Sequence, residues 1–123
     1  MSANRWVSLG AVLGFFSVAF GAFGAHALKD VLNEKSIVIY QTAVHYQMVH
    51  SLALVLFGIW AGLHPGGARS WLGGLFVAGT LLFSGSLYGL ALTGIRHLGW
   101  ITPVGGVGLL AGWILFAFLS WRA

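Results

Sequence analysis

The sequence predicts an all-α integral membrane protein, built as a four-transmembrane-helix bundle with glycine-rich packing faces. Charged residues make up only 7% of the 123 residues, whereas a soluble domain carries about 25% and distributes them along its amphipathic elements. The few charges lie between four long apolar segments, and many of the 19 glycines lie inside those segments. These observations predict helices that face lipid on the outside and each other on the inside.

Each apolar segment is long enough to cross a bilayer. The uncharged stretches cover residues 6–28, 36–68, 70–95 and 97–121. A hydrocarbon core of about 30 Å requires about 20 helical residues, and a helix pairs its own backbone amides, which hydrocarbon cannot do. We expect a single transmembrane domain over residues 1–123, with helices at about 6–28, 40–63, 71–92 and 103–121.

The first segment has the general plan of a secretory signal peptide. Arg5 precedes an apolar stretch that ends in the small residues of Ala25-His26-Ala27. Such signals usually have an apolar core of about 7–15 residues. The apolar stretch here is longer, because it runs from Val7 to Ala25. We therefore expect this segment to remain as the first transmembrane helix.

The second segment is polar in its first half and aliphatic in its second half. The preceding loop, residues 29–35, holds both acidic residues. The polar half is poorly suited to contact lipid, so we expect it to face the other helices. Its polar residues are Tyr40, Gln41, Thr42, His45, Tyr46, Gln47 and His50. The run His64-Pro65-Gly66-Gly67 contains a helix breaker and two flexible residues, and it predicts the end of this helix.

A turn is predicted between the third and fourth segments, at residues 93–97. Thr102 and Pro103 are typical of a helix start, with Thr102 as the N-cap and Pro103 in the first helical position. The alternative is a proline kink within a longer helix that begins near Leu98, because neighbouring helices can satisfy a carbonyl group freed by proline.

Small residues recur at helical spacing in three segments and predict faces where helix backbones approach closely. A glycine inside a helix costs about 1 kcal/mol relative to alanine in water, so its repeated use indicates close packing. The predicted packing positions are Gly10, Gly14, Gly21, Gly24, Gly85, Gly89, Gly108 and Gly112, with Gly74 and Ala78 on the same face as Gly85. We favour contacts within one chain for most of these faces, although the same spacing also serves contacts between copies.

Polar side chains from three segments are predicted to form one buried cluster. Its expected members are His26, His45, Tyr46, Gln47, His50, Ser84, Ser86 and Tyr88. In the first interpretation these side chains join helices by hydrogen bonds worth about 0.6–2 kcal/mol each. In the second, His26, His50 and Tyr88 line a path for a proton, an ion or a small solute, because ionisable groups in lipid often mark such paths. A third alternative is a haem or metal site between His26 and His45 or His50.

Catalytic and nucleic-acid-binding functions have little support in the residue pattern. The chain has no cysteine, which excludes disulfides and thiolate ligands. Asp30 and Glu34 lie in one short loop beside lysines, as in a solvated turn. Ser84 has no acid nearby in the sequence to complete a triad, and the basic residues are scattered singly. We expect no catalytic residue, no metal, no cofactor and no nucleic-acid partner.

Four motifs, in order along nearly the whole chain, carry a resemblance to a known family. They are Gly21-Ala22-Phe23-Gly24-Ala25-His26-Ala27-Leu28, Tyr46-Gln47-Met48-Val49-His50-Ser51-Leu52-Ala53, Phe83-Ser84-Gly85-Ser86-Leu87-Tyr88, and Thr102-Pro103-Val104-Gly105-Gly106 followed by Leu110-Ala111-Gly112-Trp113. The chain resembles the domain-of-unknown-function family 423, small multi-span bacterial membrane proteins with eukaryotic relatives. The resemblance implies a multi-pass protein of the cell inner membrane and implies no activity. We therefore expect a non-enzymatic structural or accessory component of the membrane.

Orientation and partners are only loosely constrained by the sequence. Arg5, Arg69 and Arg122 lie at one predicted end of the bundle, and Lys29, Lys35 and Arg96 lie at the other. The positive-inside rule therefore does not choose between them, and the N-terminal amine favours both termini in the cytoplasm. The expected partners are the lipid bilayer and either further copies of the chain or a larger membrane complex.

Overall fold

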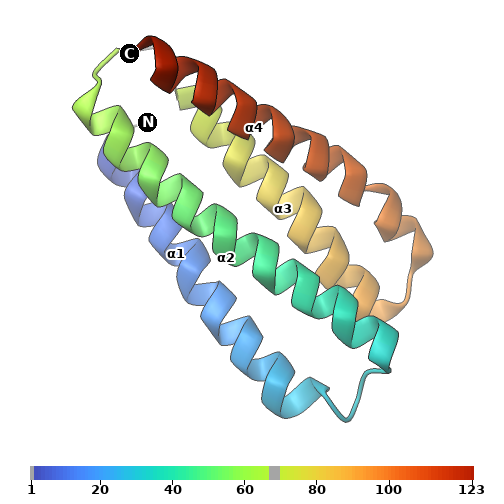
Figure 1. Cartoon of the computed structure of the whole chain (residues 1–123). Helices are drawn as coiled ribbons and strands as arrows, with labels where there is room; N and C mark the ends of the chain where they lie inside the picture. Colours follow the sequence, from blue (N-terminus) through green and yellow to red (C-terminus); the bar gives the residue numbers. More distant parts are fainter. Residues whose placement is uncertain (1, 67–69) are drawn as a thin grey trace.

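Four long helices run side by side in the computed structural model, which describes residues 2–66 and 70–123 (Figure 1). They are α1 (Ala3–Phe23), α2 (Glu34–Leu63), α3 (Ser70–Thr93) and α4 (Thr102–Arg122). A π-helical turn, η1 (Gly24–Leu28), extends α1, and a 3₁₀ turn, η2 (Arg96–Trp100), precedes α4. Four spans, α1 with η1, α2, α3, and η2 with α4, are long and apolar enough to cross a membrane, which confirms the predicted all-α membrane class.

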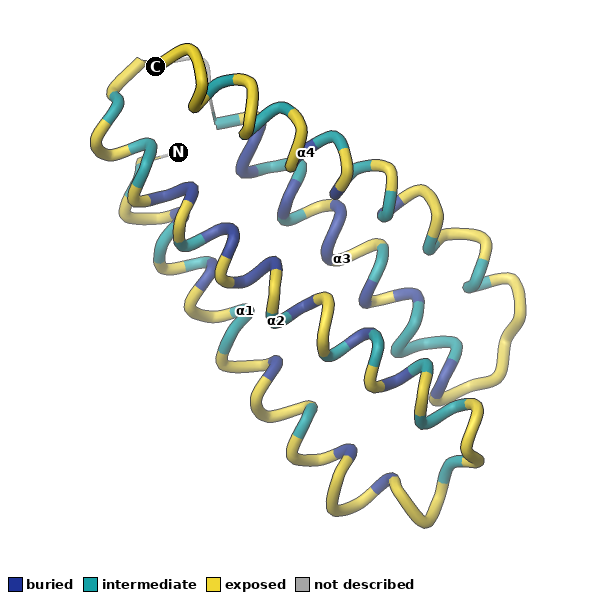
Figure 2. The backbone as a smooth tube through the Cα atoms, in the orientation of Figure 1, coloured by how far each residue is buried: buried dark blue, intermediate teal, exposed yellow. Residues whose placement is uncertain are grey.

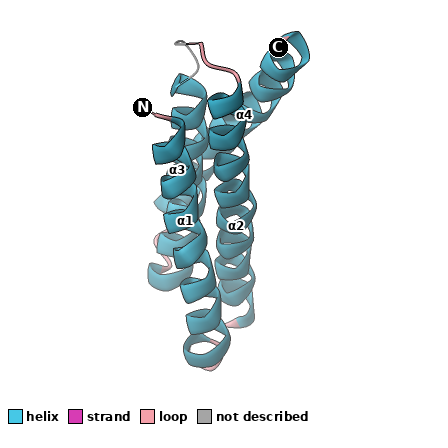
Figure 3. Cartoon of the chain, turned by 90° about the vertical axis from the view of Figure 1, so that its left-hand side faces the viewer, coloured by secondary structure: helices cyan, strands magenta, loops and turns pink. Residues whose placement is uncertain are grey.

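Helices α2 and α3 form the centre of the bundle. Each helix packs mainly on its neighbours in the sequence, so α1 lies against α2 and α4 lies against α3. The outer helices α1 and α4 are accordingly the more exposed of the four (Figure 2). The view turned by 90° shows the described loops at the ends of the helices (Figure 3). Both chain ends lie at the same end of the bundle (Figure 1).

Helix α2 begins earlier than the predicted residue 40. Asn33 caps it, because the Asn33 Oδ1 atom accepts a 2.8 Å hydrogen bond from the Ser36 amide. Glu34 lies in the first turn, where a carboxylate interacts favourably with the helix dipole. Glu34 and Lys35 therefore belong to the helix and not to the loop. The second helix ends at Leu63 as expected, and the Gly67 and Arg69 positions of the following turn fall outside the described residues.

Thr102 is not the N-cap of α4. The cap position is held by Ile101, and Thr102 is the first residue of the helix. The hydroxyl group of Thr102 shares a 2.6 Å hydrogen bond with Ser86 Oγ of α3, so a contact between helices replaces the predicted cap. Residues 96–100 form a separate 3₁₀ turn before α4, which argues against one long helix kinked at Pro103.

Most of the predicted glycine positions lie at contacts between helices. A Cβ atom added at Gly10 would lie 2.9 Å from the Ser51 carbonyl oxygen of α2, a distance that real side chains avoid. The other α1 glycines also face α2, and the α4 glycines face α3. The closest neighbours are Ser51 for Gly14, Val44 for Gly21, Tyr40 for Gly24, Leu98 for Gly89, Gly79 for Gly108 and Phe76 for Gly112.

The prediction for Gly85 is wrong. A Cβ atom at Gly85 or Gly74 would meet nothing within 4 Å, so neither glycine lies at a contact within the described part of the chain. Helix α3 instead approaches its neighbours at Gly73, which faces the Trp6 ring, and at Gly79, which faces Leu109. Adjacent positions in a helix differ by about 100°, and a helix that is apolar all round gives no pattern to distinguish these faces.

Candidate functional site

The predicted polar cluster separates into distinct sites on α2 and α3. Gln47, His50, Ser84 and Ser86 are buried, and Tyr88 is partly buried. His26, His45 and Tyr46 are exposed, so they do not belong to a buried cluster. The structure therefore corrects the prediction of a single cluster.

Gln47 links three helices near the middle of the bundle. The Tyr88 hydroxyl of α3 donates a 2.6 Å hydrogen bond to Gln47 Oε1. Gln47 Nε2 in turn donates a 3.0 Å bond to the Leu13 carbonyl of α1. Tyr88 also packs edge-on against Phe20 and Tyr40, with ring centroids 5.3 Å apart in both pairs. The amide of Gln47 thus uses both a donor and an acceptor to join its neighbours on either side.

His50 lies on the other side of α2, toward α4. The indole Nε1 of Trp113 donates a 2.9 Å hydrogen bond to His50 Nε2. Because indole is a donor only, Nε2 must be the unprotonated nitrogen. The proton then lies on Nδ1, which donates a 2.7 Å bond to the Tyr46 carbonyl. Both ring nitrogens of a neutral imidazole are therefore engaged, and neither is free to bind a metal.

The two serines of α3 also bind across helices. Ser84 Oγ donates a 2.8 Å hydrogen bond to the Ala43 carbonyl of α2. Ser86 Oγ donates a 2.9 Å bond to the Phe83 carbonyl and shares the bond with Thr102 of α4. Together with the bond between Tyr88 and Gln47, these serines connect α3 to α2 and to α4.

Two hollows lie on opposite sides of the α2–α3 pair. One, of about 280 Å³, is lined by residues of α1, α2 and α3, including Gln47, Thr80 and Tyr88. The other, of about 300 Å³, is lined by α2, α3 and α4 and includes His50 and Trp113. His26 lines neither hollow. The residues predicted to line one conduction path, His26, His50 and Tyr88, are therefore not brought into one cavity.

Thr80 is the exception to the pattern of satisfied polar groups. It is buried, and its Oγ1 is the one buried side-chain nitrogen or oxygen atom without a hydrogen-bond partner among the described residues. The hollow beside it is lined by Leu13, Phe16, Phe20 and Leu81 together with Gln47, Ser84 and Tyr88. This hydroxyl group adds no bond that stabilises the bundle.

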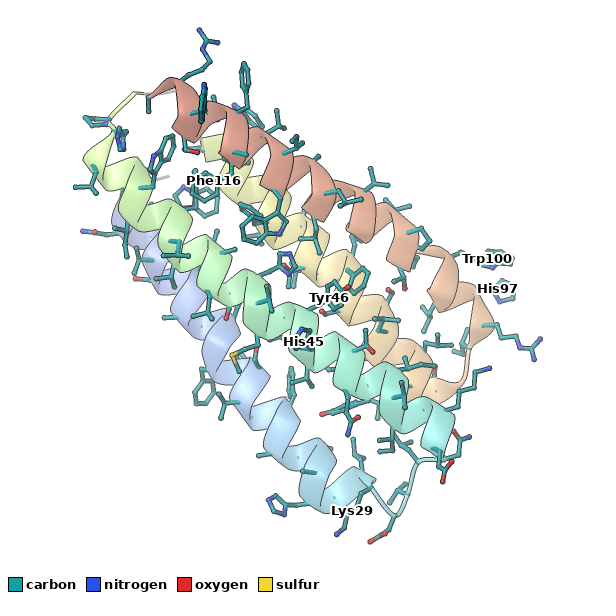
Figure 4. All side chains as sticks on the ribbon, viewed as in Figure 1. Lys29, His45, Tyr46, His97, Trp100 and Phe116 are labelled. Atoms are coloured by element: carbon teal, nitrogen blue, oxygen red, sulfur yellow. The ribbon has the colours of Figure 1, made fainter. Side chains whose placement is uncertain are left out.

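Two of the predicted metal or haem ligands, His26 and His45, lie apart from the buried polar side chains in the described part of the chain. Across residues 2–66 and 70–123, no three His, Asp or Glu side chains lie close enough together to hold a metal. His26 sits in η1 and His45 lies on the outside of α2, and both are exposed. Figure 4 shows His45 on the outward side of α2. The predicted pairing of His26 with His50 is not formed, because both ring nitrogens of His50 are engaged in hydrogen bonds.

Sequence reasoning missed three residues that complete these bonds. Trp113 binds His50, Thr102 binds Ser86, and the Tyr40 hydroxyl donates a 2.6 Å bond to the Phe20 carbonyl of α1. The position of Trp113 in the sequence indicated a role inside the bundle, because it is the one tryptophan well inside an apolar segment. An indole N–H group that lies away from water usually has a hydrogen-bond partner. Its position alone could not identify that partner.

Known proteins similar to this chain are membrane proteins without an assigned activity. The family described as "Protein of unknown function (DUF423)" matches residues 20–106. The chain is 43% identical to a UPF0382 membrane protein of Staphylococcus haemolyticus, over 95% of both chains. It is 41% identical to one of Haemophilus influenzae, over 98% of this chain and 96% of that protein. It is 39% identical to the UPF0382 inner membrane protein YgdD of Escherichia coli, over 94% and 88% respectively.

No solved structure matches the chain. The family match covers the whole of α2 and α3, together with η1 and η2, and includes Gln47, His50, Ser84, Ser86 and Tyr88. Relatives that cover almost the full length extend the similarity to α1 and α4. The resemblance of the four motifs is thereby confirmed, and this multi-pass membrane protein belongs to the DUF423 family of proteins of unknown function.

Proposed function

We propose that the protein is a non-enzymatic structural or accessory component of the cell membrane. The observation that carries the proposal is the use of its polar interior. Five polar side chains form their hydrogen bonds with backbone or side-chain groups of the bundle. They are Gln47, His50, Ser84, Ser86 and Tyr88. Such bonds hold helices in register, and they support a role for these side chains in holding the bundle together.

The same geometry weakens the case for transport. A proton path requires polar groups that exchange partners along a continuous line. Here Gln47 and Tyr88 bind each other on the α1 side, whereas His50 and Trp113 bind each other on the α4 side. The hollow beside Gln47 and Tyr88 contains neither His50 nor Trp113 in its lining. No specific observation favours the transporter as a second candidate function.

A flux experiment tests this part of the proposal. The purified protein is reconstituted into liposomes that contain a pH-sensitive dye, and a proton gradient is applied across the membrane. We expect the same leak as in liposomes without protein, for the wild type and for Tyr88→Phe. A proton flux that Tyr88→Phe removes while the variant remains folded would contradict the structural role.

An accessory component is expected to occur in an assembly. We expect the protein, extracted in a mild detergent, to have a mass larger than one chain, owing to further copies or to a stoichiometric partner. Light scattering combined with size-exclusion chromatography gives the mass of the protein without the bound detergent. A strictly monomeric protein at the concentrations found in native membranes would argue against the assembly.

We also propose the inner membrane as the location, with both termini in the cytoplasm. The Escherichia coli relative is named an inner membrane protein. Both chain ends lie at one end of the bundle, so a single reporter result constrains both. Reporter domains fused after Ala123 and inserted into the loop before Glu34 should report opposite sides. An external C-terminus would overturn this orientation.

A further inference from the structure

We propose that the hollow between α1 and α3 is a binding site for a neutral lipophilic molecule, and that Thr80 donates a hydrogen bond to a carbonyl oxygen of that molecule. The hollow is the one of about 280 Å³ that also includes Gln47 of α2 in its lining. The proposal goes beyond the structural role, because it gives the bundle a ligand. It starts from a buried hydroxyl group that the packing of the helices leaves unused.

Thr80 lines this hollow and has an unsatisfied hydroxyl group. The residue is 2% exposed, and its Oγ1 atom has no hydrogen-bond partner among the described residues. A buried polar group without a partner is costly, and native proteins contain few of them. Threonine in a helix has two favourable rotamers, so rotation about one bond can turn the hydroxyl group toward a molecule in the hollow. A ligand with a hydrogen-bond acceptor would remove the cost of this group.

Gln47 supplies a second donor. Its Nε2 atom carries two hydrogens, and the hydrogen bond that this atom donates within the described part of the chain goes to the Leu13 carbonyl. The hydroxyl groups of Ser84 and Tyr88 also line the hollow, but both already donate within the bundle. The hollow therefore lacks an acceptor. A carbonyl oxygen has two lone pairs, which matches the two unused donors of Thr80 and Gln47.

The lining is polar at its buried part and apolar at its exposed part. We call the buried polar residues the floor of the hollow and the exposed residues of α1 and α3 its rim. The floor holds Gln47, Thr80 and Ser84, and the rim holds Phe16, Phe20, Leu81 and Gly85. No lining residue in the described part of the chain carries a formal charge, so a charged group would lack a partner there. The ligand is therefore expected to be neutral, with its carbonyl group at the floor and its apolar body at the rim.

Contacts between α1 and α3 close the two ends of the hollow. At one end the Trp6 ring lies against Gly73, and at the other end the rings of Phe20 and Tyr88 meet with centroids 5.3 Å apart. Thr80 lies between these contacts, about 10 Å from Gly73 and about 12 Å from Tyr88 along the helix axis. A helix is about 10–12 Å across with its side chains, so a helix lying along this crevice would collide with both contacts. The closed ends favour a small molecule over a helix of another protein.

An ordinary phospholipid does not match the hollow. Its acyl chains have no acceptor for Thr80, and its ester carbonyls belong to the interfacial region outside the hydrocarbon core. Thr80 lies near the middle of α3, which runs from Ser70 to Thr93. The class of ligand that fits is a lipid-soluble carbonyl compound whose polar end can enter the hydrocarbon region.

Two matched probes test the need for an acceptor. Dicyclohexyl ketone and dicyclohexylmethane have the same two rings and differ only in the carbonyl group. The chain has no cysteine, so Gly85→Cys places a single thiol at the rim, where an added Cβ atom meets nothing within 4 Å. Gly74→Cys is the matched control, because Gly74 has equally open space on the same helix and does not line the hollow. The rate of reaction with N-ethylmaleimide, in purified protein in lipid nanodiscs, measures how far each probe protects each thiol.

We expect the ketone to slow the reaction of the Gly85→Cys thiol at least threefold and to leave the Gly74→Cys thiol unchanged. The hydrocarbon should protect neither thiol. Adding Thr80→Val to Gly85→Cys should weaken the apparent affinity for the ketone by about threefold to tenfold, as for the loss of one hydrogen bond. Thr80→Ser keeps the hydroxyl group and should keep the protection.

Photolabelling of the unsubstituted chain locates the site independently of the cysteine variants. Benzophenone carries the same acceptor, and irradiation makes its carbonyl group react with a nearby C–H bond. The oxygen takes the hydrogen and the carbon forms the new C–C bond, so the protein gains the full mass of the probe. Mass spectrometry of peptides should place the label within residues 13–20 or 80–88. An excess of dicyclohexyl ketone should reduce this labelling, and dicyclohexylmethane should not.

Four results would each overturn the proposal. Equal protection by the ketone and the hydrocarbon would mean that the hollow accepts any apolar chain. Protection that Thr80→Val leaves unchanged would remove the role of its hydroxyl group. A lack of both protection and label would mean that the hollow is filled by water or lipid, and disulfide dimers of Gly85→Cys would mean that a second copy covers it. The proton-flux and mass measurements do not depend on this site, so its failure would leave the structural role in place.

Discussion

The indole nitrogen of Trp113 donates a 2.9 Å hydrogen bond to Nε2 of His50 and so joins α4 to α2. Helix α4 packs mainly on α3, so this bond and the aromatic contact of Phe116 with Phe57, with centroids 5.7 Å apart, reach across to the central helix. Phe76 completes the contact, with its ring 5.3 Å from that of Trp113. The outer helix is thereby anchored to both central helices.

Trp113→Phe should lower the free energy of unfolding by about 1–2 kcal/mol, because it removes this bond and leaves His50 Nε2 without a donor. Unfolding of the purified protein in mixed micelles of a mild detergent and dodecyl sulfate measures the change. Trp121→Phe is the control, since Trp121 is 90% exposed. Equal effects of the two substitutions would show that the bond has no stabilising role.

Tyr88→Phe should lower stability by about 1 kcal/mol. The substitution keeps the ring that packs against Phe20 and Tyr40 and removes only the hydroxyl group bound to Gln47. Tyr46→Phe is a matched control, because the Tyr46 hydroxyl has no hydrogen bond to the described residues and the side chain is exposed. The same unfolding assay should leave the Tyr46 variant unchanged, and a loss there of similar size would count against the assignment.

Two glycine substitutions should have opposite outcomes. Gly105 lies directly against the backbone of α3, where an added Cβ would meet the Phe83 amide nitrogen and would be 2.9 Å from the Gly79 carbonyl oxygen. Gly105→Ala should therefore cost more than about 2 kcal/mol, because backbone cannot move aside as a side chain can. Gly85→Ala meets open space and should be neutral or stabilising by up to about 1 kcal/mol.

Thermal aggregation temperatures in detergent would be enough to rank the two glycine variants. A strongly destabilised Gly85→Ala would mean that an unseen neighbour fills the space beside it. A tolerated Gly105→Ala would contradict the close approach of α3 and α4.

Thr80→Val should increase stability by about 1 kcal/mol. The hydroxyl group of Thr80 is buried and has no partner within the described residues, so replacing it with a methyl group of similar shape removes an unsatisfied polar atom. Ser84→Ala, one turn along the same helix, removes a formed bond to Ala43 and should lower stability by about 1 kcal/mol. If Thr80→Val is the destabilising member of the pair, then its hydroxyl group has a partner such as water.

Hydropathy and length were sufficient to predict the helices, since backbone groups in hydrocarbon must pair within a helix. The residues at which the helices begin and end were less predictable. Helix α2 begins at Glu34 and not near residue 40, because the apolar pattern marks the hydrocarbon core while a cap such as Asn33 lies in the polar region beyond it. The hydroxyl of Thr102 binds Ser86 and does not cap α4. A residue suited to a cap can also bind a neighbouring helix, and the sequence does not distinguish the two roles.

Composition and segment length settled the membrane class and the number of spans, because the cost of exposing backbone or charge to hydrocarbon depends on the local residues alone. The rotation of each helix about its axis could not be predicted from composition and segment length. Gln47 and His50 face the interior while His45 faces outward, and Gly79 replaces Gly85 at the helix contact. Such choices follow from which neighbouring helix packs on which face, and that depends on all four helices at once.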